Sequence, residues 1–185
     1  MMKYLEEDFE FHKPIDNYPY EQIRDFASGW FTEKEGEWYR KQCNFIFNGN
    51  IIEIGSYEGL SLSYIKDTIK NNNNKIYSVD KELNKRLIRN CNKWGVNLIQ
   101  GDSVNCSKLF PNEFFDLIFI DACHFYKYVK EDILSWLPLL KNNAIIAGHD
   151  YDNYWVGVKK AVDEILPEKK LIERIWYFKK TKLFK

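Results

Sequence analysis

Five acidic side chains stand at or near the carboxyl ends of short apolar segments of the chain. They are Glu53, Asp80, Asp102, Asp121 and Asp150. The carboxyl ends of parallel strands form the ligand crevice of an open α/β sheet, so we expect these acids to converge on one site. A helix cap or a solvated loop explains any single acid more readily. Five acids in corresponding positions indicate a site that binds ligand hydroxyls or a positive charge.

A glycine-containing turn follows the first of these segments. In residues 50–59 an apolar run precedes Gly55 and Gly59, and apolar residues at helical spacing follow, which predicts strand, tight turn and helix. The Lys-Ser or Lys-Thr pair of a phosphate-binding loop is absent, and Tyr57 stands where a dinucleotide fingerprint has glycine. The turn therefore suits a nucleoside better than a pyrophosphate, although by itself an ordinary strand-to-helix turn explains it equally well.

Two of the acids have positions typical of nucleoside binding. Asp80 follows Gly55 by 25 residues, the place of a carboxylate that accepts hydrogen bonds from two ribose hydroxyls. Asp102 and Ser103 would contact the edge of a base. Equally, Asp102 would cap a helix over about residues 104–110.

The order of the elements predicts an α/β fold. Strand-like segments cover residues 51–54, 75–80, 96–99, 115–121 and 144–148, with a β-rich stretch at 171–178. Helical patterns lie between them, at about 60–70, 83–94, 126–140 and 156–166. This alternation predicts a Rossmann-like, doubly wound, mostly parallel sheet of six or seven strands with helices on both faces.

The residues before the sheet are expected to form an N-terminal unit. Residues 1–20 have mixed charge and no period, which indicates an irregular arm. Thr32 to Glu35 is a capping box that begins a helix to about Phe47. Residues 1–48 are thus an arm and a capping helix, and residues 49–185 are the ligand-binding α/β domain, within a single structural domain.

Composition favours a small-molecule partner. Basic and acidic residues each number 27, so no net charge draws the chain to nucleic acid or to an anionic membrane. The start of the chain lacks an apolar signal core, and no stretch approaches the roughly 20 apolar residues of a membrane span. The four cysteines show no disulfide or zinc spacing, which fits reduced thiols in the cytoplasm. The sequence does not decide whether the chain forms a homo-oligomer.

Several motifs resemble those of class I S-adenosylmethionine-dependent methyltransferases. They are the turn from Glu53 to Gly59, Asp80, Gly101-Asp102-Ser103, the strand 115–121 with His124 beyond it, and Gly148-His149-Asp150-Tyr151. The likeness covers about residues 29–178 and is strongest toward small-molecule O-methyltransferases of the macrolide-sugar and cephalosporin type, which are related to catechol O-methyltransferase. It implies S-adenosylmethionine as the cofactor.

The resemblance assigns cofactor contacts. The turn would lie against the methionine portion, Asp80 would bind the ribose, and Asp102 with Ser103 would reach the adenine. The full expected set is Glu53, Gly55, Ser56, Tyr57, Gly59, Asp80, Lys81, Asp102, Ser103 and Asp121. The resemblance also implies a seventh, antiparallel strand, for which residues 171–179 leave little room because no turn signal divides them.

His124 and Asp121 are the expected catalytic residues. Methyl transfer from a sulfonium is an in-line displacement, so the protein must align the acceptor and remove the proton of an acceptor hydroxyl. The unperturbed pKa of histidine, about 6.5, suits a general base, and the resembled enzymes have Lys or His at this offset. The alternative is a structural histidine that bonds within its loop.

Metal use is left open by the sequence. Many resembled enzymes bind a divalent ion such as Mg²⁺ with an acid at the position of Asp121 and an acidic pair after the fifth strand, matched here by His149 and Asp150. Cys123 also stands where a further acid is common. Two carboxylates and one imidazole suit Mg²⁺ less well than three oxygens would.

The favoured function is O-methylation of a small hydroxylated acceptor of sugar or natural-product type. Aromatic residues near the expected crevice would wall its pocket or belong to the core: Trp30, Phe31, Trp38, Tyr151, Tyr154 and Trp155. A catalytically silent S-adenosylmethionine-binding module is the alternative, and a nicotinamide-dependent dehydrogenase, with an incomplete glycine fingerprint, is a weaker one. Nucleic-acid amino-methyltransferases carry a Pro-Pro-Tyr turn that is absent after Asp121.

Overall fold

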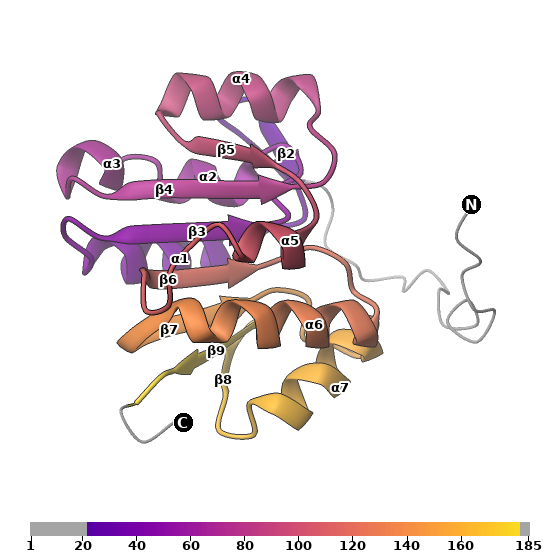
Figure 1. The fold of residues 1–185 in the computed structure, drawn as a ribbon. Coiled ribbons are helices and arrows are strands. Elements are labelled where there is room, and N and C mark those ends of the chain that lie inside the picture. Colours follow the sequence, from indigo (N-terminus) through magenta and orange to yellow (C-terminus); the bar gives the residue numbers. More distant parts are fainter. Residues whose placement is uncertain (1–21, 182–185) are drawn as a thin grey trace.

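A seven-stranded sheet forms the centre of the computed structural model, which describes residues 22–181 (Figure 1). Its strand order is β5-β4-β3-β6-β7-β9-β8. The bounds are β3 Asn50–Ile54, β4 Lys75–Asp80, β5 Asn97–Gln100, β6 Phe115–Ile120, β7 Leu140–Gly148, β8 Lys170–Ile172 and β9 Ile175–Lys179. β3 to β7 pair in parallel, and β9 runs antiparallel to β7 and β8. The predicted Rossmann-like, mostly parallel sheet is confirmed.

The edge of the sheet corrects one prediction. The sequence seemed to leave no turn within residues 171–179, yet β8 and β9 form a hairpin in which Ile172 pairs with Ile175. Only Glu173 and Arg174 connect the strands, and Glu173 adopts a φ of 51°. A two-residue hairpin needs positive φ, which is usually supplied by glycine or asparagine, so a glutamate there gave no turn signal.

Helices cover both faces of the sheet (Figure 1). One face carries α1 Glu33–Asn44, α2 Leu60–Ile65, α3 Thr68–Asn71 and α4 Lys85–Trp94; the other carries α5 Ser103–Ser107, α6 Tyr126–Trp136, the 3₁₀ helix η2 Leu137–Leu139 and α7 Val156–Ile165. Ile51 and Leu117 belong to the buried cluster under α1, and their neighbours Ile52 and Ile118 to the cluster under α6. Alternate side chains of the central strands thus fill opposite layers.

The N-terminal part begins with a two-stranded hairpin, β1 Gln22–Arg24 and β2 Ala27–Gly29, which the sequence did not predict. The predicted arm, residues 1–20, lies outside the described residues, so the division at residue 48 stays a prediction. The capping box is confirmed: Thr32 accepts from the Glu35 N–H, and Glu35 accepts from the Thr32 N–H at 2.8 Å. None of the described helices is long and apolar enough to cross a membrane.

Glu53 is a buried acid in the central strand β3. Its Oε1 accepts from Ser61 Oγ at 2.6 Å, while its Oε2 has no hydrogen-bond partner among residues 22–181. Burial raises the pKa of Glu53 to about 7, and the hydrogen bond from Ser61 only partly opposes this. The ionised carboxylate therefore destabilises the folded state.

We expect Glu53→Gln to stabilise the protein at pH 8.5 and to have little effect at pH 5. The native state holds the proton to about pH 7, whereas the unfolded chain releases it near the ordinary glutamate pKa of 4.5. Stability is therefore lost as pH rises through this window, up to about 3 kcal/mol. Glutamine keeps the acceptor for Ser61 without the charge. Urea unfolding of both proteins at the two pH values measures the difference, and equal midpoints at pH 8.5 would contradict it.

Candidate active site

Two adjoining cavities open at the carboxyl ends of the parallel strands. The larger has a volume of about 740 Å³ and the smaller about 480 Å³. Both are lined by Gly55, Tyr57, Asp121 and Ala122, so they meet where β3 and β6 end. This is the crevice expected for an open α/β sheet.

Most of the predicted cofactor residues line the larger cavity. These are Gly55, Tyr57, Asp80, Lys81, Asp102, Ser103 and Asp121. Ser56 lines the smaller cavity, and Glu53 and Gly59 are on the wall of neither. Cys123 and Asp132 also line the larger cavity, as do Asn84 and Tyr128, which the sequence did not single out. They come from loops and helix faces that carry no motif of their own.

Gly55 allows the two strand ends to approach. Its φ is 83°, and a Cβ at this position would lie 2.2 Å from the carbonyl oxygen of Asp121. Only glycine fits both the left-handed backbone and the contact. The predicted tight turn is therefore required by packing against β6.

Asp80 fixes the same turn from the side of β4. Its Oδ2 accepts from the backbone N–H groups of Ser56 and Tyr57, both at 3.0 Å, and its Oδ1 accepts from the Glu82 N–H at 3.0 Å. The carboxylate thus holds the backbone around Gly55 while it lines the larger cavity.

Asp102 and Ser103 begin α5 beside this cavity. Asp102 is the N-cap of the helix and accepts from the Asn105 N–H at 3.2 Å. Ser103 Oγ accepts from Trp136 Nε1 at 2.8 Å. Both residues also line the cavity, so the cap explains the acid structurally without removing it from the site. Asp132, behind Ser103, is buried, and this raises its pKa to about 6.

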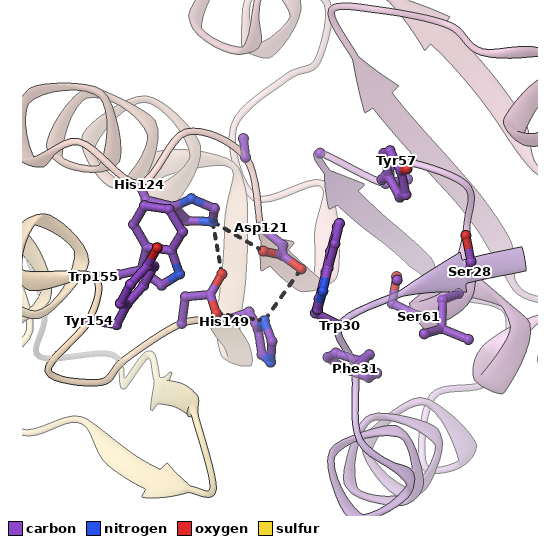
Figure 2. Close-up of a pocket in the computed structure, with 16 residues that line it drawn as sticks. Ser28, Trp30, Phe31, Tyr57, Ser61, Asp121, His124, His149, Tyr154 and Trp155 are labelled. Atoms are coloured by element: carbon purple, nitrogen blue, oxygen red, sulfur yellow. Dashed lines mark ion pairs between the residues drawn. The ribbon is translucent and has the colours of Figure 1, made fainter. Parts of the chain in front are cut away.

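Aromatic rings wall the smaller cavity. Figure 2 shows Tyr154 and Trp155 beside His124, with Trp30 and Tyr57 across Asp121 from them. The rings of Trp30 and Tyr57 are 5.7 Å apart, and Trp155 lies 4.0 Å from the imidazole of His124. Of the predicted aromatic set, Trp30, Phe31, Tyr154 and Trp155 line this cavity. The remaining two face other partners, Trp38 packing on Tyr177 and Tyr151 donating to Asp163.

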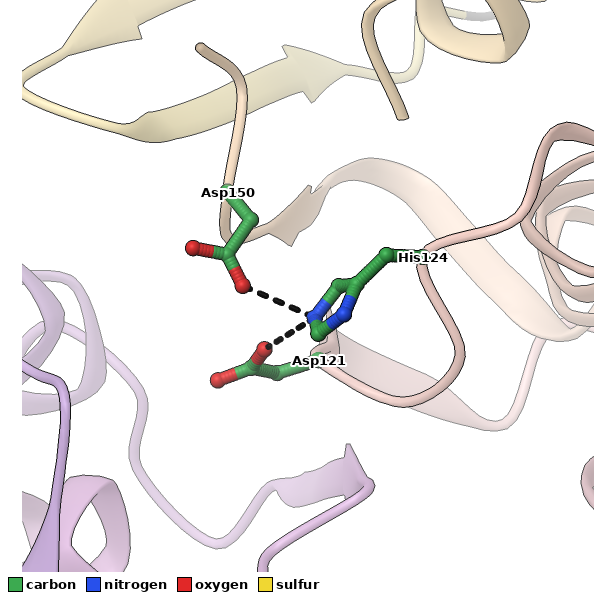
Figure 3. A group of neighbouring side chains, drawn as sticks. All are labelled: Asp121, His124 and Asp150. Carbon is green, nitrogen blue, oxygen red and sulfur yellow. Dashed lines mark ion pairs between the residues drawn. The ribbon is translucent and has the colours of Figure 1, made fainter. Parts of the chain in front are cut away.

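Four charged or titratable side chains form the polar side of the smaller cavity. Nε2 of His124 lies 2.8 Å from Asp150 Oδ2 and 3.9 Å from Asp121 Oδ1 (Figure 3). Nδ1 of His149 lies 3.4 Å from Asp150 Oδ1 and 3.7 Å from Asp121 Oδ2. Each carboxylate therefore turns one oxygen toward each imidazole. Nε2 of each histidine makes no hydrogen bond within residues 22–181, so the contacts of His124 with the two acids are ion pairs.

Glu35 and Arg174 complete this cluster from behind. Glu35 Oε1 lies 3.2 Å from Nε2 of His149, and Arg174 Nη1 donates to Asp150 Oδ1 at 3.2 Å. Glu35 was predicted only as part of a capping box. Its contact with His149 joins residues far apart in the chain, and no sequence signal reports such a pairing.

The charges of the cluster compensate one another. Burial alone would lower the pKa of both histidines, but the carboxylates around them raise it to about 9 for His124 and about 10 for His149. Burial would raise the pKa of Glu35, yet His149 and Arg174 hold it at about 2. The pKa of Asp150 is likewise held well below its usual range, against burial, by the two histidines.

Among the described residues, one group of side chains could hold a metal ion: ligand atoms of Asp121, His124 and Asp150 all lie within 4.8 Å of one another. His149, the imidazole expected as a ligand from the sequence, is outside this group. Its Nδ1 lies 3.4 Å from Asp150 and 3.7 Å from Asp121, on the buried side of the same two acids.

The chain matches a protein family described as a methyltransferase domain over residues 52–151, which is more than half of its length. No curated protein matches it in sequence.

Solved structures of similar fold include three O-methyltransferases. CalS11, a TDP-rhamnose 3′-O-methyltransferase of calicheamicin biosynthesis, is 14% identical with a TM-score of 0.63 over 81% of each chain. NovP is 14% identical with a TM-score of 0.66 over 80% of each chain. An S-adenosylmethionine-dependent enzyme from Thermotoga maritima is 16% identical with a TM-score of 0.60, covering 80% of this chain and 65% of its own. These likenesses show a shared fold. The family match shows that the chain belongs to the methyltransferase-domain family, which confirms the class I S-adenosylmethionine-dependent methyltransferase recognised from the sequence.

Proposed function

We propose that the protein transfers the methyl group of S-adenosylmethionine to a hydroxyl oxygen of a small acceptor. The donor would occupy the larger cavity and the acceptor the smaller. The observation that carries this proposal is the junction of the cavities at Gly55, Tyr57, Asp121 and Ala122. A donor and an acceptor bound on either side of that junction would meet in line, which is what methyl transfer requires.

The walls of the smaller cavity support a hydroxylated ring as the acceptor. Trp30 and Trp155 offer flat apolar surfaces, and Asp121, Asp150 and His124 offer groups that can accept from hydroxyls. A sugar or a phenolic natural product has both properties. The similar folds of CalS11 and NovP, which are described as O-methyltransferases, agree with this class.

His124 is the proposed general base. Its side chain lines the smaller cavity, and its buried Nε2 lies 2.8 Å from Asp150, which orients the ring. The acceptor hydroxyl gives its proton to the imidazole, its oxygen attacks the methyl carbon, and the bond from carbon to sulfur breaks to leave S-adenosylhomocysteine. His124 is protonated at neutral pH while its pKa is about 9. The positive sulfonium of a bound donor would lower that pKa and favour the basic form.

A divalent ion would fit beside the base. Asp121, Asp150 and His149 would hold it, which leaves the imidazole of His124 as the base. When bound, such an ion supplies positive charge that lowers the pKa of the acceptor hydroxyl. The further work of orienting the acceptor falls to the aromatic walls.

Donor binding is predicted to depend on Asp80. S-adenosylmethionine at 100 times its Kd should stabilise the wild type by about 2.7 kcal/mol in a thermal-shift titration. Asp80→Ala removes the carboxylate that is proposed to accept hydrogen bonds from two ribose hydroxyls of the donor. It should therefore weaken donor binding roughly 10- to 100-fold. Asp67→Ala removes an exposed acid that caps nothing and serves as the control. Equal affinity for wild type and Asp80→Ala would count against the donor site.

Turnover is predicted to depend on His124. With a panel of nucleotide sugars and phenols and a labelled methyl donor, His124→Ala should slow transfer by roughly 10²- to 10⁴-fold and leave donor affinity unchanged. Lys127→Ala, an exposed change on α6, is the matched control. Undiminished turnover would remove His124 from the mechanism. Normal donor binding without product on any acceptor would favour the silent module.

A further inference from the structure

His149 is held between acids on both sides. Its side chain is 2% exposed, with Nε2 facing Glu35 and Nδ1 facing Asp121 and Asp150. Figure 2 shows its ring directly beside Asp121, on the other side of the acids from His124. Carboxylate oxygens only accept hydrogen bonds, so a lone pair on either ring nitrogen would face negative charge. Each nitrogen therefore requires a cation between itself and its acid.

The carboxylate of Glu35 accepts four hydrogen bonds. It is fully buried, and its Oε2 accepts from Thr32 N at 2.8 Å and Thr32 Oγ1 at 2.9 Å. Arg174 donates to it through its backbone N–H at 3.1 Å and its Nη2 at 3.3 Å. The carboxylate is thus held from the start of α1 and from the β8–β9 turn. Its fixed position keeps a proton on Nε2 of His149 and leaves Nδ1 to face Asp121 and Asp150.

This arrangement is similar to that of a metal-ligating histidine. Such residues usually donate their second ring N–H to a carboxylate, which sets the tautomer and makes the ligating nitrogen more basic. At Nε2 of His149 the Glu35 carboxylate lies at an ion-pair distance of 3.2 Å, without hydrogen-bond alignment. His124 differs, because among the described residues only Asp121 and Asp150 face it as acids. The two imidazoles are therefore suited to different tasks, and His149 is the one prepared as a ligand.

The donor atoms also select the metal. Mg²⁺ prefers oxygen ligands in near-octahedral geometry and keeps several waters. A nitrogen ligand raises the affinity for first-row transition ions such as Mn²⁺ and Co²⁺ over Mg²⁺. The replacement of an oxygen ligand by His149 thus changes which ion the site takes.

We propose that Glu35 is the positioning residue of a divalent-metal site made by Asp121, His149 and Asp150, and that this site binds Mn²⁺ or Co²⁺ in preference to Mg²⁺. The proposal deepens the methyl transfer proposed above, since the ion would serve the acceptor hydroxyl. Its test needs neither donor nor acceptor. Loss of metal binding and loss of donor binding are therefore separate results.

The test is a metal titration of the full chain after treatment with a chelator. Mn²⁺ is followed by electron paramagnetic resonance, Co²⁺ by its visible absorption, and Mg²⁺ by competition against Mn²⁺. We expect Mn²⁺ to bind at least about 10-fold more tightly than Mg²⁺. Glu35→Gln should weaken Mn²⁺ binding by roughly 10- to 100-fold. His149→Asn, which replaces the nitrogen ligand by an amide oxygen, should remove the preference over Mg²⁺.

Two controls separate metal binding from folding. Thr32→Ala breaks the same capping box but keeps the Glu35 carboxylate and three of its four donors, so it should lower the melting temperature and weaken Mn²⁺ binding much less than Glu35→Gln does. Glu37→Gln removes an exposed charge on the same helix, paired only with Arg40 among the described residues, and should change neither quantity.

Three results would overturn the proposal. They are a wild type that binds neither Mn²⁺ nor Co²⁺, equal affinities for Mn²⁺ and Mg²⁺, and a folded Glu35→Gln protein with wild-type Mn²⁺ affinity. If the wild type binds neither Mn²⁺ nor Co²⁺, the cation between Nδ1 of His149 and its acids is a proton and not a metal ion. Methyl transfer without a metal would then be tested separately, by the donor-binding experiment and by the turnover of His124→Ala.

Discussion

The close approach of Gly55 to the end of β6 determines where both cavities lie. A side chain at this position would meet the Asp121 carbonyl at 2.2 Å, so the two central strands end against each other only because residue 55 is glycine. Asp80 then holds the following N–H groups from β4. The turn after β3 is thereby fixed by both neighbouring strands, β4 and β6. Both cavities are lined by residues of this turn. A donor and an acceptor bound as proposed would meet beside this turn.

The buried cluster at the smaller cavity ties distant parts of the chain to this turn. Glu35 comes from α1, His149 and Asp150 follow β7, and Arg174 comes from the β8–β9 turn. An isolated buried charge is costly, but each of these groups has an opposite charge within ion-pair distance. The N-terminal helix and the hairpin at the edge of the sheet are thus required for the electrostatics of the site, although neither carries the expected catalytic residues.

Most of the sheet and much of the lining of the larger cavity could be predicted because their signals are local. Apolar runs ending in acids mark parallel strands, and the carboxyl ends of such strands meet by topology. Lys81 and Ser103 were included in the predicted set because they directly follow the acids Asp80 and Asp102 in the sequence. Glu35 could not be found this way, since its partner His149 is joined to it only in the folded chain. The β8–β9 hairpin was missed for the opposite reason: its turn is local, but Glu173 adopts a backbone conformation that its residue type rarely indicates.

The two histidines place one pair of carboxylates between two different surroundings. Asp121 and Asp150 each present one oxygen to the partly exposed His124 and the other to the buried His149. His124 lines the smaller cavity against Trp155, while His149 is enclosed by Glu35 and Phe31. A group that exchanges protons needs access, and a group that holds a fixed charge needs burial and a rigid partner. The surroundings of each imidazole, rather than its distance from the acids, therefore decide which task it can perform.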